Sequence, residues 1–313
     1  MSTSFWPLIK FVPAQTHFKF TRLAPFLAIV SAVAVIASVV SFMTLHLNLG
    51  LDFKGGTVIE FSTPGPAPLA EMRVALAKAG LKDAQVQGLG APNTAKLSYV
   101  PEGADPTAEV PKLEGTLARQ FPGIKFKPAN SVGSKVSGEL FAKGMTALGV
   151  ALGLMLLYIW FRFQLQFGLG AVIAIFHDLI LTVGMLSFLQ IEFSMTSIAA
   201  LLTIIGYSMN EKVITFDRLR ENLRKYRRTA LRDIIDLSEN ERLSRTLITG
   251  STALLALGGM LFLGGPALYP LVFAMVFGIV VGTYSSIYVA LPIILVWGVK
   301  RGDEDATPLQ PRP

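Results

Sequence analysis

The sequence predicts an α-helical polytopic membrane protein, in which six transmembrane helices carry one small α+β domain between the first and the second. The chain of 313 residues is 52% hydrophobic and only 16% charged, with a mean hydropathy of +0.53, whereas soluble domains carry about 25% charged residues. Six apolar stretches are long enough to cross about 30 Å of hydrocarbon. One polar segment of domain size, residues 47–135, separates the first stretch from the second.

The predicted spans end where apolar sequence gives way to charge. They cover residues 23–45, 144–161, 167–189, 193–216, 243–263 and 269–299. The first is too long for a signal peptide. The sixth is longer than a perpendicular crossing needs, so we expect it to tilt or to bend near Pro292. The domain organisation is a leader (1–22), a first helix (23–46), an outer domain (47–135), helices two to six (136–299, with a basic loop at 217–243) and a tail (300–313).

The orientation follows from where lysine and arginine collect. The net charge is +7, but its clustering at the ends of spans is typical of membrane topology and argues against nucleic acid. The loops at 190–192 and 264–266 contain no basic residue. We therefore expect both termini in the cytoplasm and residues 47–135 outside. The basic residues that set this orientation are Lys10, Lys19, Arg22, Arg162, Arg218, Arg220, Arg224, Lys225, Arg227, Arg228, Arg232, Arg242, Lys300 and Arg301.

Several kinds of chemistry are excluded by composition. The absence of cysteine excludes disulfides, cysteine-ligated zinc, iron–sulfur clusters and a thiol nucleophile. The histidines, His17, His46 and His177, are widely separated, so no histidine-rich metal site is expected. No nucleophile–base constellation is visible. We therefore predict no cofactor, no metal and no enzyme activity.

The outer segment alternates between strand and helix patterns. Strands are expected at 57–62, 84–88, 96–100 and 124–127, and helices at 69–79 and 108–120. The order β-α-β-β-α-β matches the ferredoxin-like motif. No nucleophile elbow, phosphate loop or metal signature accompanies it, so we interpret this domain as a binding or lever module.

The stretch from Gly50 to Thr57 joins the first span to the first strand. Asp52 is able to cap the turn, and Phe53 follows it. Gly55 and Gly56 permit positive φ angles or a close backbone approach. By itself this pattern is an ordinary connection into a strand.

Glu211 and Lys212 interrupt the fourth apolar stretch. A charge within a spanning helix costs several kcal/mol, on the order of 3 by insertion scales, so such a residue is kept because it pairs or carries something across. Lys212 is expected to extend to the cytoplasmic headgroups. Glu211 is either a carboxylate solvated or neutralised near a helix end, or a protonatable group inside the bundle. Ser208 and Thr215 lie one turn on either side of it.

A second polar pair, His177-Asp178, is predicted near the middle of the third span. It is either a structural pair satisfied by Thr182 or part of a transport path. Arg245 enters the fifth span at a depth comparable to Glu211. Arginine favours an ionised carboxylate and desolvation favours a protonated one, so a site balanced between them binds and releases a proton. The alternative is a static ion pair that fixes helix register.

The proton-relay candidates are therefore Glu211, Arg245 and Asp178. Polar neighbours that could support them are Asn210, Lys212, Asp217, Arg218 and His177. Two glycine pairs spaced by four residues, Gly149 with Gly153 and Gly278 with Gly282, predict close helix packing.

The chain resembles the SecF family, the smaller subunit of the SecD–SecF protein-export complex in the RND superfamily. The resemblance rests on G-L-D-F-x-G-G-T at 50–57, S-V-G-x-x-V-S-G-E-L at 131–140, A-x-x-H-D at 174–178 and the long match at 198–222. S-R-T-L-I-T at 244–249 and S-S-I-Y-V-A at 285–290 complete it. Glu211 falls where the family has aspartate, and Arg245 falls at the family's arginine. Lys212 replaces a small or hydroxyl residue.

The resemblance implies an RND-type half that pairs with SecD and acts with the SecYEG translocon, with YajC and YidC as further partners. It implies a multi-pass protein of the bacterial plasma (inner) membrane, with residues 47–135 in the periplasm. Proton-motive force would drive late steps of export of polypeptides on the periplasmic side, and membrane lipids would surround the helices. Two alternatives stay open: a stand-alone RND-type small-molecule/proton antiporter, and a membrane-protein assembly factor without ion flux.

Overall fold

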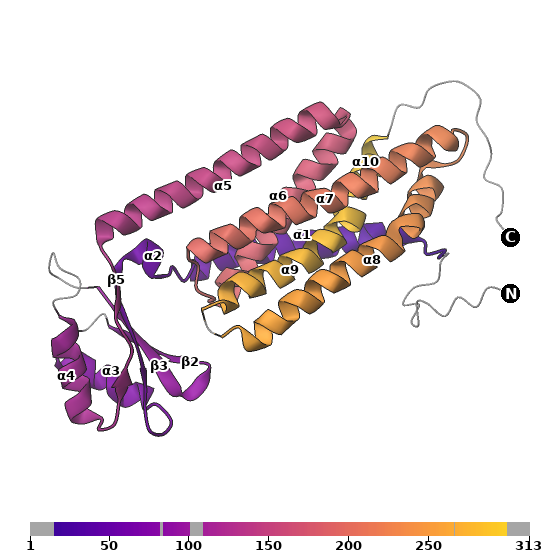
Figure 1. Ribbon diagram of the computed structural model, residues 1–313. Helices are drawn as coiled ribbons and strands as arrows, with labels where there is room; N and C mark the ends of the chain where they lie inside the picture. Colours follow the sequence, from indigo (N-terminus) through magenta and orange to yellow (C-terminus); the bar gives the residue numbers. More distant parts are fainter. Residues whose placement is uncertain (1–15, 82–83, 101–108, 266, 299–313) are drawn as a thin grey trace, which may run out of the picture.

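The computed structural model describes residues 16–81, 84–100, 109–265 and 267–298 (Figure 1). Long helices lie side by side in a bundle, and a small domain of strands and helices lies beyond one end of it. Residues 1–15 of the leader, the tail 300–313 and the predicted boundary positions 108, 266 and 299 lie outside the described residues, as do Lys10, Lys300 and Arg301.

Within the described part of the chain, five helices are long and apolar enough to cross a membrane. They are α1 (Phe20–Leu45), α5 (Ser134–Arg162, with the candidate span at Lys135–Arg162), α6 (Leu165–Phe188), α8 (Leu231–Leu263) and the helix Tyr269–Trp297. The fourth predicted span lies in α7 (Met195–Lys225), which is not among the five because charged residues fill its second half. A capping box of Ser194 and Ser197 starts α7.

The sixth predicted span is interrupted where a bend was expected. It consists of α9 (Tyr269–Ser285), a π-helical stretch η1 (Ser286–Ala290) and α10 (Leu291–Trp297). Pro292 has no N–H to donate to a carbonyl four residues earlier, and the wider π turn covers those positions. The interruption places two neighbouring serines, Ser285 and Ser286, in the interior of the bundle.

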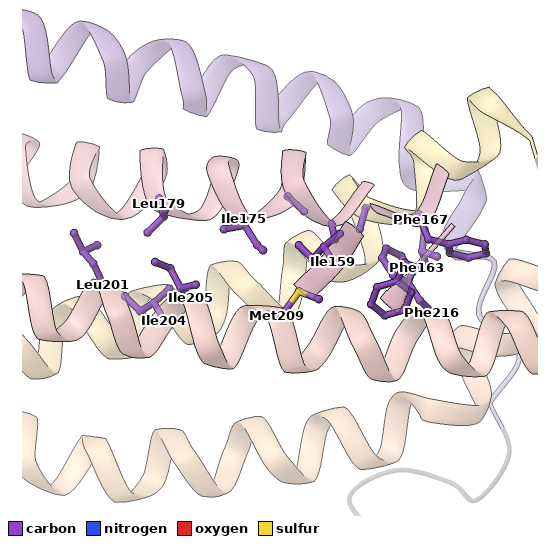
Figure 2. Close-up of a cluster of buried hydrophobic side chains, with 14 of the residues drawn as sticks. Ile159, Phe163, Phe167, Ile175, Leu179, Leu201, Ile204, Ile205, Met209 and Phe216 are labelled. Atoms are coloured by element: carbon purple, nitrogen blue, oxygen red, sulfur yellow. The ribbon is translucent and has the colours of Figure 1, made fainter. Parts of the chain in front are cut away.

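The core of the bundle lies between α6 and α7, as Figure 2 shows for Ile175, Leu201 and Ile205. At its edge Phe216 meets Phe163 and Phe167 edge-to-face, at centroid distances of 5.6 and 5.3 Å. In the most apolar stretch of α6, 61% of the residues are buried, against 11% in each of α1, α5 and α8. These three helices therefore turn apolar side chains outward, as a membrane environment requires.

Close helix packing occurs at one of the two predicted glycine pairs. A Cβ at Gly278 would lie 2.5 Å from Ile204, and one at Gly282 would lie 3.3 Å from Ser208, so α9 approaches α7 closely. The prediction for Gly149 and Gly153 is wrong, because a Cβ at either would meet no described atom within 4 Å.

The predicted basic loop at 217–243 is helical for most of its length. α7 runs to Lys225 and α8 begins at Leu231, so only residues 226–230 connect them. The reason is that the charges pair with one another: Arg218 donates to Glu221 (2.6 Å) and to Glu241 on α8 (2.8 Å). Hydropathy predicts only the part of a helix that lies in lipid, and these helices continue beyond the lipid. α5 likewise begins ten residues before the predicted start at 144.

The outer domain contains one antiparallel sheet. Its elements are β1 (Gly56–Ser62), α3 (Leu69–Lys78), β2 (Gln85–Leu89), β3 (Ala91–Tyr99), α4 (Val110–Gln120), β4 (Lys125–Phe126) and β5 (Asn130–Val132). The strand order is β2-β3-β1-β4, and β5, which the sequence did not predict, also pairs with β1. The two helices cover one face of the sheet (Figure 1). Ile59, Phe61, Met72, Leu97 and Leu117 are buried between them.

The segment between α1 and β1 lies against the connection from α6 to α7. The N–H of Gly50 donates to the carbonyl of Phe193 (2.9 Å), and the N–H of Phe193 donates to the carbonyl of Asn48 (2.8 Å). Residues Leu51–Lys54 then form a single helical turn, α2, which was not predicted. Lys96 on β3 forms an ion pair with Glu192, which fastens the sheet to the same connection.

Asp52 caps a helix distant in the sequence rather than its own turn. Its Oδ2 accepts the backbone N–H of Met195, the first residue of α7, at 3.0 Å. A carboxylate at a helix N-terminus binds a free N–H and interacts favourably with the helix dipole. Phe53 is buried beside Phe141 and Phe193, with ring centroids 5.3 and 5.8 Å away. The outer domain is therefore tied to the start of α7.

Both glycines that follow have positive φ, 70° at Gly55 and 118° at Gly56, which confirms the expectation for this pair. A Cβ at Gly56 would also lie 2.5 Å from the carbonyl oxygen of Tyr99 on β3. Only glycine fits this position without moving the first strand of the sheet.

Replacing Gly56 by alanine is expected to destabilise the outer domain by about 1–3 kcal/mol, because the new methyl group adds backbone strain and a clash. Thermal unfolding of the purified full chain measures this as a lower midpoint. The matched control is Gly65→Ala, where a Cβ meets nothing within 4 Å. Equal midpoints for the two variants would contradict the assignment of strain to Gly56.

Candidate functional site

Two buried ion pairs lie next to each other inside the bundle. The first joins α6 to α7: Lys212 Nζ donates to Asp178 Oδ2 at 2.9 Å, and both side chains are no more than 1% exposed. Ser208, one turn before Lys212, and Ser285 on α9 complete the cluster. Nζ donates to both hydroxyls, at 3.0 Å to Ser285, and both hydroxyls donate to the carboxylate, Ser285 at 2.8 Å. All three N–H groups of the ammonium therefore have acceptors.

His177 contacts the carboxylate of Asp178, whereas Thr182 contacts its backbone. His177 Nδ1 lies 3.0 Å from Asp178 Oδ1, and its ring stacks on Tyr284 of α9. Its Nε2 is buried and has no hydrogen-bond partner among the described residues. Thr182, expected to satisfy the carboxylate, instead donates to the backbone carbonyl of Asp178 (2.8 Å).

The second ion pair joins α7 to α8. Glu211 Oε2 lies 3.4 Å from Arg242 Nη1 and accepts the hydroxyl of Thr246 at 3.1 Å. The guanidinium of Arg242 also contacts Glu239, through Nε at 2.8 Å and Nη2 at 2.6 Å. Its remaining N–H groups donate to Thr246 (2.8 Å) and to Ser286 on η1 (3.0 Å). These side chains are all buried.

The two ion pairs form one polar core. Glu211 and Lys212 are consecutive on α7, and Ser285 and Ser286 are consecutive where α9 passes into η1. Lys212 and Ser285 contact each other in the first ion pair's cluster. Glu211 and Ser286 both contact Arg242 in the second. The polar core therefore involves five elements (α6, α7, α8, α9 and η1) and runs from Asp178 on α6 to Arg242 on α8, through the apolar interior.

The structure changes two expectations for the charged residues. Lys212 does not extend to the headgroups: it is fully buried and bound to Asp178, because α6 and α9 supply acceptors within reach of its ammonium. Arg245 is exposed on α8, and the arginine that contacts Glu211 is Arg242, about one turn earlier. Glu211 therefore contacts Arg242 rather than Arg245, and a role of Arg245 in proton relay stays a prediction.

The other predicted supporting residues lie outside the polar core. Asn210 is exposed on α7. Asp217 pairs with Arg162 at the end of α5 (2.9 Å), and both side chains are largely solvent-accessible. Arg218 binds Glu221 and Glu241. These residues stabilise the end of the bundle at the α7–α8 connection and do not contact Glu211.

Sequence reasoning missed half of the polar core, namely Arg242, Glu239, Thr246, Ser285 and Ser286. Arg242 and Glu239 were placed in a solvated loop. Spacing offered one signal, because Glu239, Arg242 and Thr246 follow one another at intervals of three and four and share a helix face. The signal for Ser285 and Ser286 was weaker: they are two consecutive polar residues within an apolar span.

Glu211 is a buried carboxylate that contacts one guanidinium and one hydroxyl, those of Arg242 and Thr246. Among the described residues, no group of three or more histidine, aspartate or glutamate side chains is placed to hold a metal ion. The fold is thus that of a polytopic helical membrane protein with a charged interior and an outer domain tied to the charged helix.

Comparison with known proteins identifies the family. Residues 113–300 match the family model "Protein export membrane protein SecD/SecF, C-terminal", and residues 40–63 match the "SecD/SecF GG Motif". The protein translocase subunits SecF of Cereibacter sphaeroides and Rhodobacter capsulatus are 41% and 42% identical; the matches cover 94% and 96% of this chain and 94% and 95% of theirs. The chain belongs to the SecF family of protein translocase subunits, and is a membrane protein and an accessory subunit of the Sec translocase.

Solved structures agree with this assignment. The SecDF crystal structure from Thermus thermophilus is 31% identical, with a TM-score of 0.83 over 92% of this chain. A SecDF structure in the super-membrane-facing form is 30% identical, with a TM-score of 0.65. The chain spans 40% and 39% of these two SecDF chains, respectively.

Replacing Lys212 by methionine is expected to destabilise the protein by about 3–5 kcal/mol, because Asp178 is then a buried charge without its cation. The double variant Asp178→Asn with Lys212→Met should recover most of that loss, since neither charge remains. Thermal unfolding of the solubilised chain measures both effects.

Arg162→Met is the matched control for that experiment. It breaks an ion pair that is 38% and 45% exposed, so it should cost less than about 1 kcal/mol. A double variant no more stable than Lys212→Met alone would contradict the assignment of the loss to an unpaired Asp178.

Proposed function

We propose that this chain couples proton movement through Glu211 to late steps of protein export, as one half of a heterodimer with SecD. The observation that carries the proposal is Glu211 itself: a carboxylate 1% exposed, in the middle of a helix, held by Arg242 and Thr246. A buried carboxylate beside an arginine inside a helix bundle is a candidate for a functional proton site. Asp178 joins Glu211 in the proton path through Lys212 and the two serines.

The membrane part is a six-helix RND-type half in this proposal, with α7 as the fourth span. Five helices qualify by composition alone. α7 lies among them (Figure 1), and its Ser208, Glu211, Lys212 and Thr215 are buried in the bundle. That is the expected position for a helix whose charges are functional.

The outer domain is ferredoxin-like in this proposal. The order β1-α3-β2-β3-α4-β4 and the strand order β2-β3-β1-β4 support it. β5 is then an addition that leads the chain back to the membrane.

The domain acts as a lever on the proton site. Asp52 binds the first N–H of α7, and Glu211 and Lys212 lie on the same helix. A shift of α7 that accompanies protonation would therefore be transmitted to the sheet through Asp52, Gly50 and the ion pair between Lys96 and Glu192.

The proposed location is the bacterial inner membrane, with both termini in the cytoplasm. Arg162, Arg220, Arg224 and Lys225 gather at the end of the bundle away from the outer domain (Figure 1), in line with the positive-inside rule. The outer domain then lies in the periplasm, where it meets exported polypeptides. SecYEG, YajC and YidC are the further partners proposed, and no enzyme activity is assigned.

Glu211→Gln should lower proton flux at least about tenfold, because the amide cannot exchange a proton while keeping nearly the same shape. Glu211→Asp should keep most of the flux. The measurement is the pH change inside proteoliposomes that contain the chain together with its SecD subunit, alongside export of a secreted protein in cells.

Glu221→Gln serves as the control for the flux experiment, because Glu221 is an exposed carboxylate on the same helix. Flux and export that are normal in Glu211→Gln would remove Glu211 from the relay. Normal export without any flux in the native heterodimer would favour an assembly factor instead.

A further inference from the structure

The polar core contains one more buried carboxylate than it has cations to balance. The carboxylates are Asp178, Glu211 and Glu239, and the cations are Lys212 and Arg242; none of the five is more than 4% exposed. Asp178 and Lys212 balance each other directly. Glu211 and Glu239 are left to share the single guanidinium of Arg242.

An unbalanced charge at this depth is costly. Arginine keeps its charge in proteins, so two ionised glutamates around Arg242 would leave a net negative charge in the interior. Two interacting carboxylates in such a place titrate as a pair and hold one proton between them. The charges of the polar core balance in the same way whether Glu211 or Glu239 carries that proton.

The contacts of Arg242 are unequal. Nε and Nη2 reach Glu239 at 2.8 and 2.6 Å, whereas Nη1 lies 3.4 Å from Glu211. The guanidinium thus binds Glu239 with two short contacts and Glu211 with one long one. In this arrangement the guanidinium is engaged mainly with Glu239, and Glu211 is the carboxylate with the longer contact.

Resting on the proposed function above, we infer that Glu239 is the second proton-holding carboxylate of the relay and that Arg242 switches between the two. When Glu211 loses its proton, the guanidinium turns toward it and releases Glu239, which takes up a proton. One O–H bond breaks at Glu211 and one forms at Glu239, and the charge of the group stays unchanged. Ser286 and Thr246 hold the remaining guanidinium N–H groups.

The surroundings of Glu239 fit this role. From its own helix it faces Arg242 and Asp236, and from α7 it faces Glu211. Tyr288 faces it from η1. Lys212 on α7 is engaged with Asp178 of α6 and also faces Glu211 and Arg242. Glu239 lies nearer than Arg242 to the start of α8, which places it on the side of the α7–α8 connection.

The test is infrared spectroscopy of the full chain co-purified with its SecD subunit, in the C=O stretching region of protonated carboxyl groups. The native protein should show a buried carboxyl band that Glu211→Gln and Glu239→Gln each abolish, because either substitution leaves one carboxylate for one guanidinium. Glu221→Gln, an exposed control, should leave the band unchanged. A band that survives in Glu239→Gln would overturn the inference.

A second measurement uses the native sequence, in case Glu239→Gln does not assemble. Dicyclohexylcarbodiimide reacts with protonated buried carboxyl groups, and mass spectrometry locates the adducts. Adducts should occur on Glu211 and on Glu239 but not on both in one molecule. Labelling of Glu211 alone, or of both together, would overturn the inference.

These results separate the inference from the proposed function. Loss of flux in Glu211→Gln with a band unaffected by Glu239→Gln refutes only the shared site. A shared band with normal flux in Glu211→Gln refutes the relay and leaves a structural proton.

Discussion

Burial of the Asp178–Lys212 ion pair is the constraint on which the rest of the bundle depends. A lysine ammonium without water needs three acceptors, and they come from three elements: the carboxylate of α6, the hydroxyl of Ser208 on α7 and that of Ser285 on α9. Each contact fixes the rotation of one helix about its axis. The close approach of α9 to α7 at Gly278 and Gly282 brings Ser285 within reach, and the adjacent Ser286 is thereby set against Arg242.

The fixed contacts of the Asp178–Lys212 pair determine the charge balance around Glu211. Because the first ion pair is fully satisfied, the excess negative charge of the core is confined to the second, where two glutamates surround one arginine. Removal of one partner from a buried pair is costly, whereas the partner exchange inferred for Arg242 keeps its charge paired. In that inference, α7 contributes Lys212 to a fixed pair and Glu211 to an adjustable pair. α7 extends from this adjustable pair to Asp52 and the outer domain.

The sequence predicted the architecture well where hydropathy decides it. Three of the five qualifying helices and most of the outer strands lie within a few residues of their predicted positions, and Glu211 and Asp178 were found because charge is rare in apolar sequence. The partners were not found in the same way. Arg242 belongs to a stretch whose charges resemble those of a loop, but in the structure this stretch is part of α8, and Arg218 of α7 pairs with Glu241 there. The direction of Lys212 depends on acceptors from α6 and α9, which no local pattern contains. Asp52 was expected to cap a turn, and its actual partner is 143 residues away.

The proposed relay requires that Arg242 responds to the proton on Glu211, and structures of the assembled heterodimer at acidic and alkaline pH test this most directly. At acidic pH the guanidinium should remain bound to Glu239 through two contacts, with Glu211 at the longer distance. At alkaline pH it should approach Glu211 to hydrogen-bonding distance while its contacts with Glu239 lengthen. Contacts that are identical at both pH values, or a Glu211 side chain that points into lipid, would contradict the account.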